Sequence, residues 1–109
     1  MSITAQDEAR VLASVPKGLL IDGMWRDSSD GSTLDVTDPA TGKVIATIAS
    51  ATAADGLAAI DAADRAQAAW AKTAPRYRAE ILRAAFDRVI ELADDFAILM
   101  SIEMGKPFR

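Results

Sequence analysis

The spacing of apolar residues changes twice along the chain, and the two changes divide it into three parts. Residues 1–16 hold one short run with helical spacing. Residues 17–50 hold short apolar runs between clusters of turn residues, as strands do. From residue 51 to residue 109, apolar residues recur every three or four positions, which is typical of amphipathic helices. The pattern therefore predicts an N-terminal arm or short helix, then two β-hairpins, then a helical segment.

The two hairpins are predicted from their turns. Asp22-Gly23 separates two short apolar runs, and such a pair favours a tight hairpin because a two-residue turn needs positive φ. A second hairpin is predicted from strands at 33–37 and 43–49, joined by a turn at 38–42 that contains Pro and Gly. Strands this short are marginally stable unless another surface covers them.

The helix boundaries follow from capping residues. In the first part, Thr4 and Asp7 have the spacing of a capping pair. In the helical segment, Thr52 is expected to cap a first helix that ends near residue 71, with an acidic residue at its third position. Thr73 is expected to cap the next helix, whose first turn contains Pro75.

The end of the helical segment allows two interpretations. Asp94 and Asp95 mark either the start of a third helix or a kink, because acidic residues suit a positive helix N-terminus. Gly105 is interpreted as a helix C-cap and Pro107 as the residue that prevents the helix from resuming. Lys106 has either a catalytic role or, in the preferred interpretation, a structural role as a cation that faces the helix dipole.

The predicted helices and hairpins have more apolar surface than they can cover among themselves. Trp25, Trp70, Phe86 and Phe96 each need cover, and an exposed large apolar side chain forfeits roughly 1.5–3 kcal/mol. The net stability of a domain is only about 5–15 kcal/mol. Core or hairpin packing is the preferred interpretation for both tryptophans, over an exposed stacking role. For the chain alone we expect self-association or a partly molten state.

Composition limits the chemistry and the partners. The chain has 12 Lys and Arg against 16 Asp and Glu, a formal net charge of −4, and no basic patch, which argues against nucleic acid or an anionic membrane as partner. The arginines at 76, 78, 83 and 88 alternate with acidic residues and are interpreted as a solvated face. No apolar run approaches the ~20 residues of a membrane span, and residues 1–16 lack the apolar core of a signal peptide, so the expected location is the cytoplasm.

The chain contains no Cys and no His. This excludes a thiol nucleophile, a disulfide, a Cys/His zinc site and a histidine general base within these residues. Carboxylates, lysines, one tyrosine and hydroxyl groups remain for any chemistry.

Five short motifs occur in a fixed order: L-I-D-G-M-W at 20–25, D-P-A-T-G-K-V-I at 38–45, an Ala-rich helix ending at Trp70, R-A-E-I-L at 78–82 and E-M-G-K-P at 103–107. In order and spacing they resemble the N-terminal part of the aldehyde dehydrogenase superfamily, over about residues 19–109. The E-M-G-K-P ending is most similar to the succinate-semialdehyde dehydrogenase branch.

The resemblance implies an α/β fold in a longer parent protein, with an α+β arrangement in this fragment itself: hairpins first, then two to three packed helices. It also implies that residues 51–109 belong to the cofactor-binding domain of the parent. The expected partners are the remainder of the parent chain and further copies of it in a homo-oligomer. The alternative is a non-catalytic, mostly helical interaction or assembly module.

For function, the resemblance implies oxidation of an aldehyde to its carboxylic acid. A Cys thiolate attacks the carbonyl, hydride passes to NAD or NADP, and a Glu-activated water releases the acid. The chain has no Cys, no segment that matches the family's catalytic Glu motif, and no Gly-rich phosphate loop. We therefore expect no catalytic and no cofactor-binding residue here, and we expect the fragment alone to be inactive and to bind no cofactor.

One site of the family can be transferred in part. Some members bind a monovalent cation through backbone carbonyls just before the turn at 38–42 and a carboxylate just before the G-K pair. The matching positions are Val36, Thr37 and Glu103. Several oxygens and one carboxylate suit a weakly held cation. The usual family residue is Asp, so Glu103 is one methylene longer, and further ligands would lie beyond residue 109.

Overall fold

The computed structural model describes residues 2–108, so the first residue of the predicted arm and the last residue of the helical segment lie outside it. The predicted order of arm, hairpins and helices is confirmed. The elements are α1 (Ala5–Ser14), β1 (Leu19–Ile21), β2 (Met24–Arg26), β3 (Thr33–Thr37), β4 (Val44–Ala49), α2 (Ala53–Ala71), α3 (Pro75–Glu91) and α4 (Ala93–Met104).

The strands form two separate antiparallel hairpins, as predicted. In the first, Leu20 lies opposite Trp25, and the turn residues Asp22 and Gly23 have φ values of 53° and 74°. Positive φ at both positions is what a tight hairpin turn of this length needs. In the second, the register of β3 and β4 shifts between the last two residues of β3, which marks a β-bulge.

Two of the three predicted N-caps are confirmed. Thr4 forms a capping box with Asp7 at the start of α1, and Thr52 forms one with Asp55 at the start of α2. Each side-chain oxygen accepts a hydrogen bond from a backbone N–H that would otherwise lack a partner.

The prediction that Thr73 caps α3 is wrong. The N-cap is Ala74, which is extended, with φ −60° and ψ 138°, because the residue before Pro75 is forced out of the helical region. Thr73 therefore lies one residue too early, and its Oγ1 instead donates to the carbonyl oxygen of Trp70 at 2.7 Å. Its hydroxyl group therefore bonds the C-terminal end of α2 and does not cap α3.

The backbone at residues 91–93 decides between the two interpretations of Asp94 and Asp95. Helix α3 ends at Glu91 and α4 begins at Ala93, with Leu92 between them at φ −98° and ψ 14°. Asp94 and Asp95 therefore lie in the first turn of a separate helix. Gly105 has φ 74° and is the left-handed C-cap that the sequence predicts.

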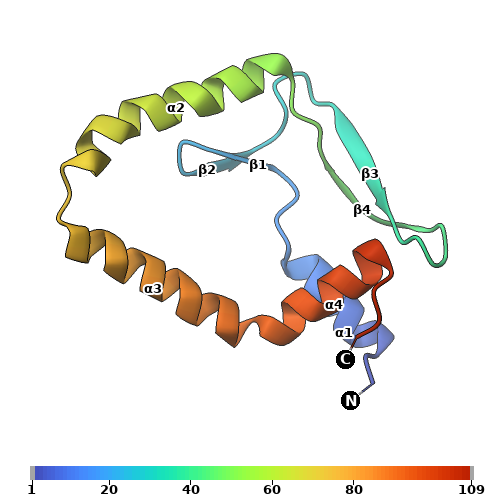
Figure 1. Cartoon of the computed structure of the whole chain (residues 1–109). Helices are drawn as coiled ribbons and strands as arrows, with labels where there is room; N and C mark the ends of the chain where they lie inside the picture. Colours follow the sequence, from blue (N-terminus) through green and yellow to red (C-terminus); the bar gives the residue numbers. More distant parts are fainter. Residues whose placement is uncertain (1, 109) are drawn as a thin grey trace.

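The elements form an open frame rather than a closed bundle (Figure 1). Helix α4 packs against α1, and α2 contacts β1, whereas α2, α3 and α4 make no comparable contact with one another. The predicted class of fold, hairpins followed by helices, is confirmed, and the closely packed helix pair joins the last helix to the first. The buried apolar residues are Val11 from α1 and Ile98 and Ile102 from α4.

The tryptophans do not lie in a core within residues 2–108. Trp25 is 56% exposed and Trp70 is 40% exposed. The core or hairpin packing predicted for both tryptophans is therefore not completed by the described residues. The radius of gyration is 17.3 Å, compared with about 13 Å for a compact domain of this length.

Candidate functional site

The end of α1, the β3–β4 hairpin and the end of α4 meet around a hollow of about 240 Å³. Val36 from β3 and Glu103 from α4 both line this hollow. Thr37 is not among the lining residues, although it is the neighbour of Val36 in the strand. The structure thus brings together two of the three residues predicted for a monovalent cation. The assignment of a metal ion to this place stays a prediction.

Lys17 lines the same hollow, and the sequence patterns did not point to it. Its Nζ donates hydrogen bonds to the carbonyl oxygens of Leu12 and Val15, at the C-terminal end of α1. Its own carbonyl oxygen accepts a bond from the backbone N–H of Ala49 at 2.8 Å, which fastens residue 17 to β4. A signal was available, because the last turn of α1 has no basic residue and helix ends favour one.

A second polar cluster surrounds Asp55 at the start of α2. Asp55 is 1% exposed, and its carboxylate accepts bonds from the backbone N–H groups of Thr52 at 2.9 Å and Ser29 at 3.1 Å. The hydroxyl of Ser28 donates at 3.3 Å, and Arg26 Nη2 donates at 3.2 Å. Every partner is a donor, so the cluster is satisfied only when the carboxylate is charged.

The pKa of Asp55 is accordingly held far below its ordinary value near 3.8, chiefly by the backbone N–H of Thr52 and then by that of Ser29. Such a carboxylate is a poor proton acceptor near neutral pH. The arrangement suits a structural role: it fixes the loop 27–32 on the N-terminus of α2. The buried negative charge of Asp55 also disfavours a phosphate at this helix end.

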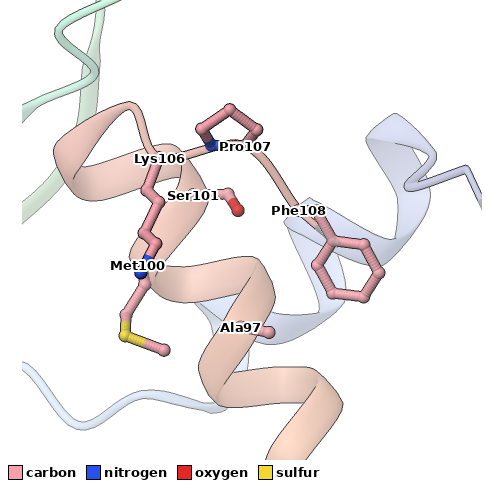
Figure 2. A pocket seen from close by; sticks show the side chains of 6 residues that line it. All are labelled: Ala97, Met100, Ser101, Lys106, Pro107 and Phe108. Carbon is pink, nitrogen blue, oxygen red and sulfur yellow. The ribbon is translucent and has the colours of Figure 1, made fainter.

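A larger hollow of about 570 Å³ lies at the end of α4 and is lined by Ala97, Met100, Ser101, Lys106, Pro107 and Phe108. In Figure 2 the Lys106 side chain runs back along α4 toward Met100, and the Phe108 ring lies on the other side of the chain end. Most of this lining is apolar, and Lys106 is its one charged side chain. Both interpretations of Lys106, catalytic and structural, stay predictions.

The arginines of α3 form a solvated face, as predicted. Their ion pairs are local and exposed, namely Arg76 with Glu80 at 3.0 Å, Arg83 with Asp87 at 3.2 Å and Arg88 with Glu91 at 2.6 Å. Arg78 differs, because its Nη1 donates to the carbonyl oxygen of Thr73 at 2.7 Å and so supports the corner between α2 and α3. Arginines whose charges are paired in this way do not form a phosphate site.

A model of the aldehyde dehydrogenase family matches residues 25–109. The chain belongs to the aldehyde dehydrogenase family. It is 61% identical over 64 residues to a succinate-semialdehyde dehydrogenase of Paenarthrobacter nicotinovorans, a match that covers 59% of the chain. It is 46% identical over 87 residues to a glutarate-semialdehyde dehydrogenase of Pseudomonas aeruginosa, which covers 80% of the chain. These two matches cover only 14% and 18% of the relatives' own lengths.

Solved structures confirm the fold of this aldehyde dehydrogenase chain. The betaine aldehyde dehydrogenase of Staphylococcus aureus, solved in complex with NAD+, superposes with a TM-score of 0.91 at 28% identity, over 94% of this chain and 21% of that one. An aldehyde dehydrogenase of Brucella melitensis biovar abortus superposes with a TM-score of 0.81 at 44% identity, over 84% of this chain and 19% of that one. The open frame is therefore a recurrent arrangement in the family.

Among the described residues of this family member, no Gly-rich loop of the kind that cradles the phosphates of a dinucleotide leads into a helix. Gly23, Gly31 and Gly42 serve turns with positive φ, and Gly105 serves a helix end. The N-terminus of α2 is already occupied by a buried carboxylate. Between residues 2 and 108, no group of three or more acidic, Cys or His side chains is placed to hold a metal, and no helix there has the length and apolarity to cross a bilayer.

Proposed function

We propose that this chain is the N-terminal part of an NAD(P)-dependent aldehyde dehydrogenase that oxidises succinate semialdehyde to its carboxylic acid. The observation that carries the proposal is the 61% identity to the Paenarthrobacter nicotinovorans succinate-semialdehyde dehydrogenase. A succinate-semialdehyde dehydrogenase [NADP(+)] of Escherichia coli is 44% identical over 81% of the chain. Together with the glutarate-semialdehyde relative, these names favour an aldehyde that carries a carboxylate at its other end.

The chemistry is assigned to residues of the parent outside this chain. The cysteine nucleophile that the family uses cannot lie here, because the chain has no Cys. No step of the reaction is assigned to the described residues, which contain no Gly-rich phosphate loop. The role proposed for this part is to form a scaffold whose apolar helix faces are covered by the remainder of the parent.

The alternative is a non-catalytic, mostly helical interaction or assembly module. The apolar face of α3 favours it, since Leu82, Phe86 and Ile90 are each more than half exposed and could receive a partner. The two proposals differ in what must cover the exposed apolar faces of the helices. A part of an enzyme needs the rest of its own polypeptide, whereas an independent module needs only its partner. Homo-oligomeric assembly of the parent and a cytoplasmic location stay predictions.

Two proteins test the proposal: the chain alone, and a chimera in which the chain replaces the matching part of the Escherichia coli relative. Both are assayed with succinate and glutarate semialdehyde, each with NAD+ and with NADP+, by absorbance of the reduced cofactor. We expect no turnover from the chain alone and turnover of succinate semialdehyde by the chimera. A matched chimera with Phe86→Asp, which places a charge on the surface to be covered, should lose both expression and activity.

Turnover by the chain alone would overturn the proposal that the catalytic residues lie in the parent outside this chain. A chimera that folds and assembles but oxidises neither semialdehyde would overturn the proposal that this part belongs to such an enzyme. In that case, a chain that is monomeric and unfolds cooperatively would favour the independent module.

A further inference from the structure

The apolar face of α3 is left uncovered by residues 2–108. Leu82, Phe86 and Val89 are spaced four and three residues apart, so they lie on one face of the helix, and each is more than half exposed. The ion pair of Arg76 with Glu80 lies on the opposite side of the same helix. No described residue of α3 is buried. The helix is therefore amphipathic, but its apolar side has no partner within the chain.

A similar surface lies on α2, and together the two faces are large. Leu57 and Ile60 are three residues apart on α2, and both are more than half exposed. The accessible surface of the chain, 8189 Å², exceeds the about 5,800 Å² of a compact monomer of this mass by about 2,400 Å². Obligate contacts between polypeptides bury about 2,000 Å² or more in total. The uncovered surface is thus large enough to hold a second polypeptide without a covalent link.

The place where the proposed parent continues is remote from much of this surface. Residue 109 follows α4, and α4 packs on α1 through the buried side chains of Val11 and Ile98. Figure 1 shows the C-terminal end beside α1 and α4, whereas the corner between α2 and α3 lies on the other side of the open frame. A partner that covers α2 and α3 is therefore held by the helix faces themselves, over a surface distant from the peptide link.

The remainder of the parent is a better occupant of these faces than a second copy of the chain. This frame makes up about a fifth of the Staphylococcus aureus relative on which it superposes, so the open shape is kept within a much longer polypeptide. A second copy would bring an equally open frame to the contact and would leave gaps, which the close packing of protein interiors disfavours. The shape thus favours a compact partner that fills the frame.

We propose that the chain binds, as a separate polypeptide, an aldehyde dehydrogenase that lacks this part, through the apolar faces of α2 and α3. The inference rests on the proposed function, since it requires that the remainder of such an enzyme covers these faces. It goes further because the surface, rather than the peptide bond after residue 109, holds the two parts together. The bound pair is expected to form a complete enzyme that oxidises the semialdehyde.

Co-expression of two separate polypeptides tests this proposal. One is the chain with an affinity tag, and the other is the Escherichia coli relative from which the matching part has been deleted, produced in a host without that enzyme. The chain is purified by its tag, and the truncated relative in the eluate is quantified by mass spectrometry. We expect comparable amounts of the two and turnover of succinate semialdehyde with NADP+, which neither polypeptide shows alone.

Phe86→Asp and Leu57→Asp test whether the two helix faces make the contact. The Phe86 ring is more than half exposed, and the Arg83 guanidinium lies 5.3 Å from its centre, so the substitution removes no buried packing from the chain itself. Each variant should recover at least about tenfold less of the truncated relative, because a charge is placed in an apolar contact. Arg76→Asp, on the opposite side of α3, is the matched control and should recover an unchanged amount.

The single-chain chimera separates this inference from the proposed function. An active chimera, with separate polypeptides that do not co-purify, would overturn the inference and leave the proposed function standing. Co-purification of the two polypeptides with no turnover by either the pair or the chimera would support the contact and overturn the proposed function. Undiminished recovery with both Phe86→Asp and Leu57→Asp would overturn the inference, as would a tagged chain that recovers only further copies of itself.

Discussion

The side chain of Asp55 holds two segments of the chain in place, namely the start of α2 and the loop 27–32. Its carboxylate accepts a hydrogen bond from the backbone N–H of Thr52 at the start of α2 and another from the backbone N–H of Ser29, 26 residues earlier in the chain. It is buried and has only donors around it, so its bonds cannot be exchanged easily for water. The loop 27–32 is therefore expected to be ordered only while Asp55 is ionised and in place.

Asp55→Asn should destabilise the chain more than any other conservative acid-to-amide change on α2. The amide has the same shape, but its NH2 group faces donors and leaves backbone N–H groups without an acceptor. Urea unfolding followed by circular dichroism measures the loss. Asp61→Asn on the exposed side of the same helix is the matched control, and it should lie within about 0.5 kcal/mol of the unaltered chain. Equal midpoints for the two variants would contradict the structural role of Asp55.

The same residue predicts how stability depends on pH. Because the folded-state pKa of Asp55 lies below its unfolded value near 3.8, its stabilisation is complete above that value and is lost as the pH falls through the folded pKa. Hydrogen bonds lower the pKa values of Asp7, Asp30 and Asp95 as well, so these carboxylates act in the same direction. We expect the free energy of unfolding to fall below about pH 4. Asp55→Asn should make that fall shallower in urea titrations between pH 5 and pH 2.5.

In each polar cluster, the sequence predicted the contacts within one helical turn and missed the contacts between residues far apart in the chain. The spacing of Thr52 and Asp55 was enough to predict a cap, because both partners lie within one turn. The bond from Arg26 to Asp55 joins residues 29 apart and depends on where the first hairpin meets α2. Lys17 was missed for the same reason: its hollow exists only because β4 and α4 approach the end of α1.

The helices and strands differ in how closely their boundaries follow from sequence. The hairpin turns and the caps of α1 and α2 use residues with a specific backbone preference, so their positions were predicted correctly. Thr73 was assigned wrongly because Pro75 constrains the residue before it more strongly than a hydroxyl group favours a cap. The pairing of α1 with α4 has no local signal, since it depends on buried contacts and on the Arg10–Asp95 ion pair at 2.8 Å.

Gly18 and Gly56 allow a paired test of how closely their surroundings pack. A Cβ at Gly18 would lie 2.8 Å from the carbonyl oxygen of Arg26, so Gly18→Ala must move the backbone of the first hairpin. We expect a loss of about 1–3 kcal/mol in the free energy of unfolding. Gly56 lies within α2 and would meet nothing within 4 Å, so Gly56→Ala should gain about 0.5–1 kcal/mol from helix propensity. Opposite shifts of the urea midpoint are the expected result, and a neutral Gly18→Ala would contradict the close approach.

The whole molecule is too extended for its apolar side chains to cover one another within residues 2–108. It measures 47 × 37 × 18 Å, and its accessible surface is 8189 Å², against about 5,800 Å² expected for a compact monomer of this mass. The excess lies largely on α2 and α3, whose apolar residues are exposed along their length. The sequence predicted this shortage of cover from the number of large apolar side chains, but it could not show that α3 would be left without any buried residue.

This exposed surface predicts that the chain alone self-associates. Leu82, at 71% exposed, and Phe86, at 55% exposed, lie four residues apart on one face of α3, so a single charge there should reduce association strongly. Sedimentation velocity over a range of concentrations should show oligomers for the unaltered chain and a shift toward monomer for Phe86→Asp. Arg76→Asp, at an exposed position on the same helix, is the control for added negative charge and should leave association nearly unchanged. A monomer at all concentrations, with cooperative unfolding, would mean that the frame is stable without cover and that the need for a longer parent is overstated.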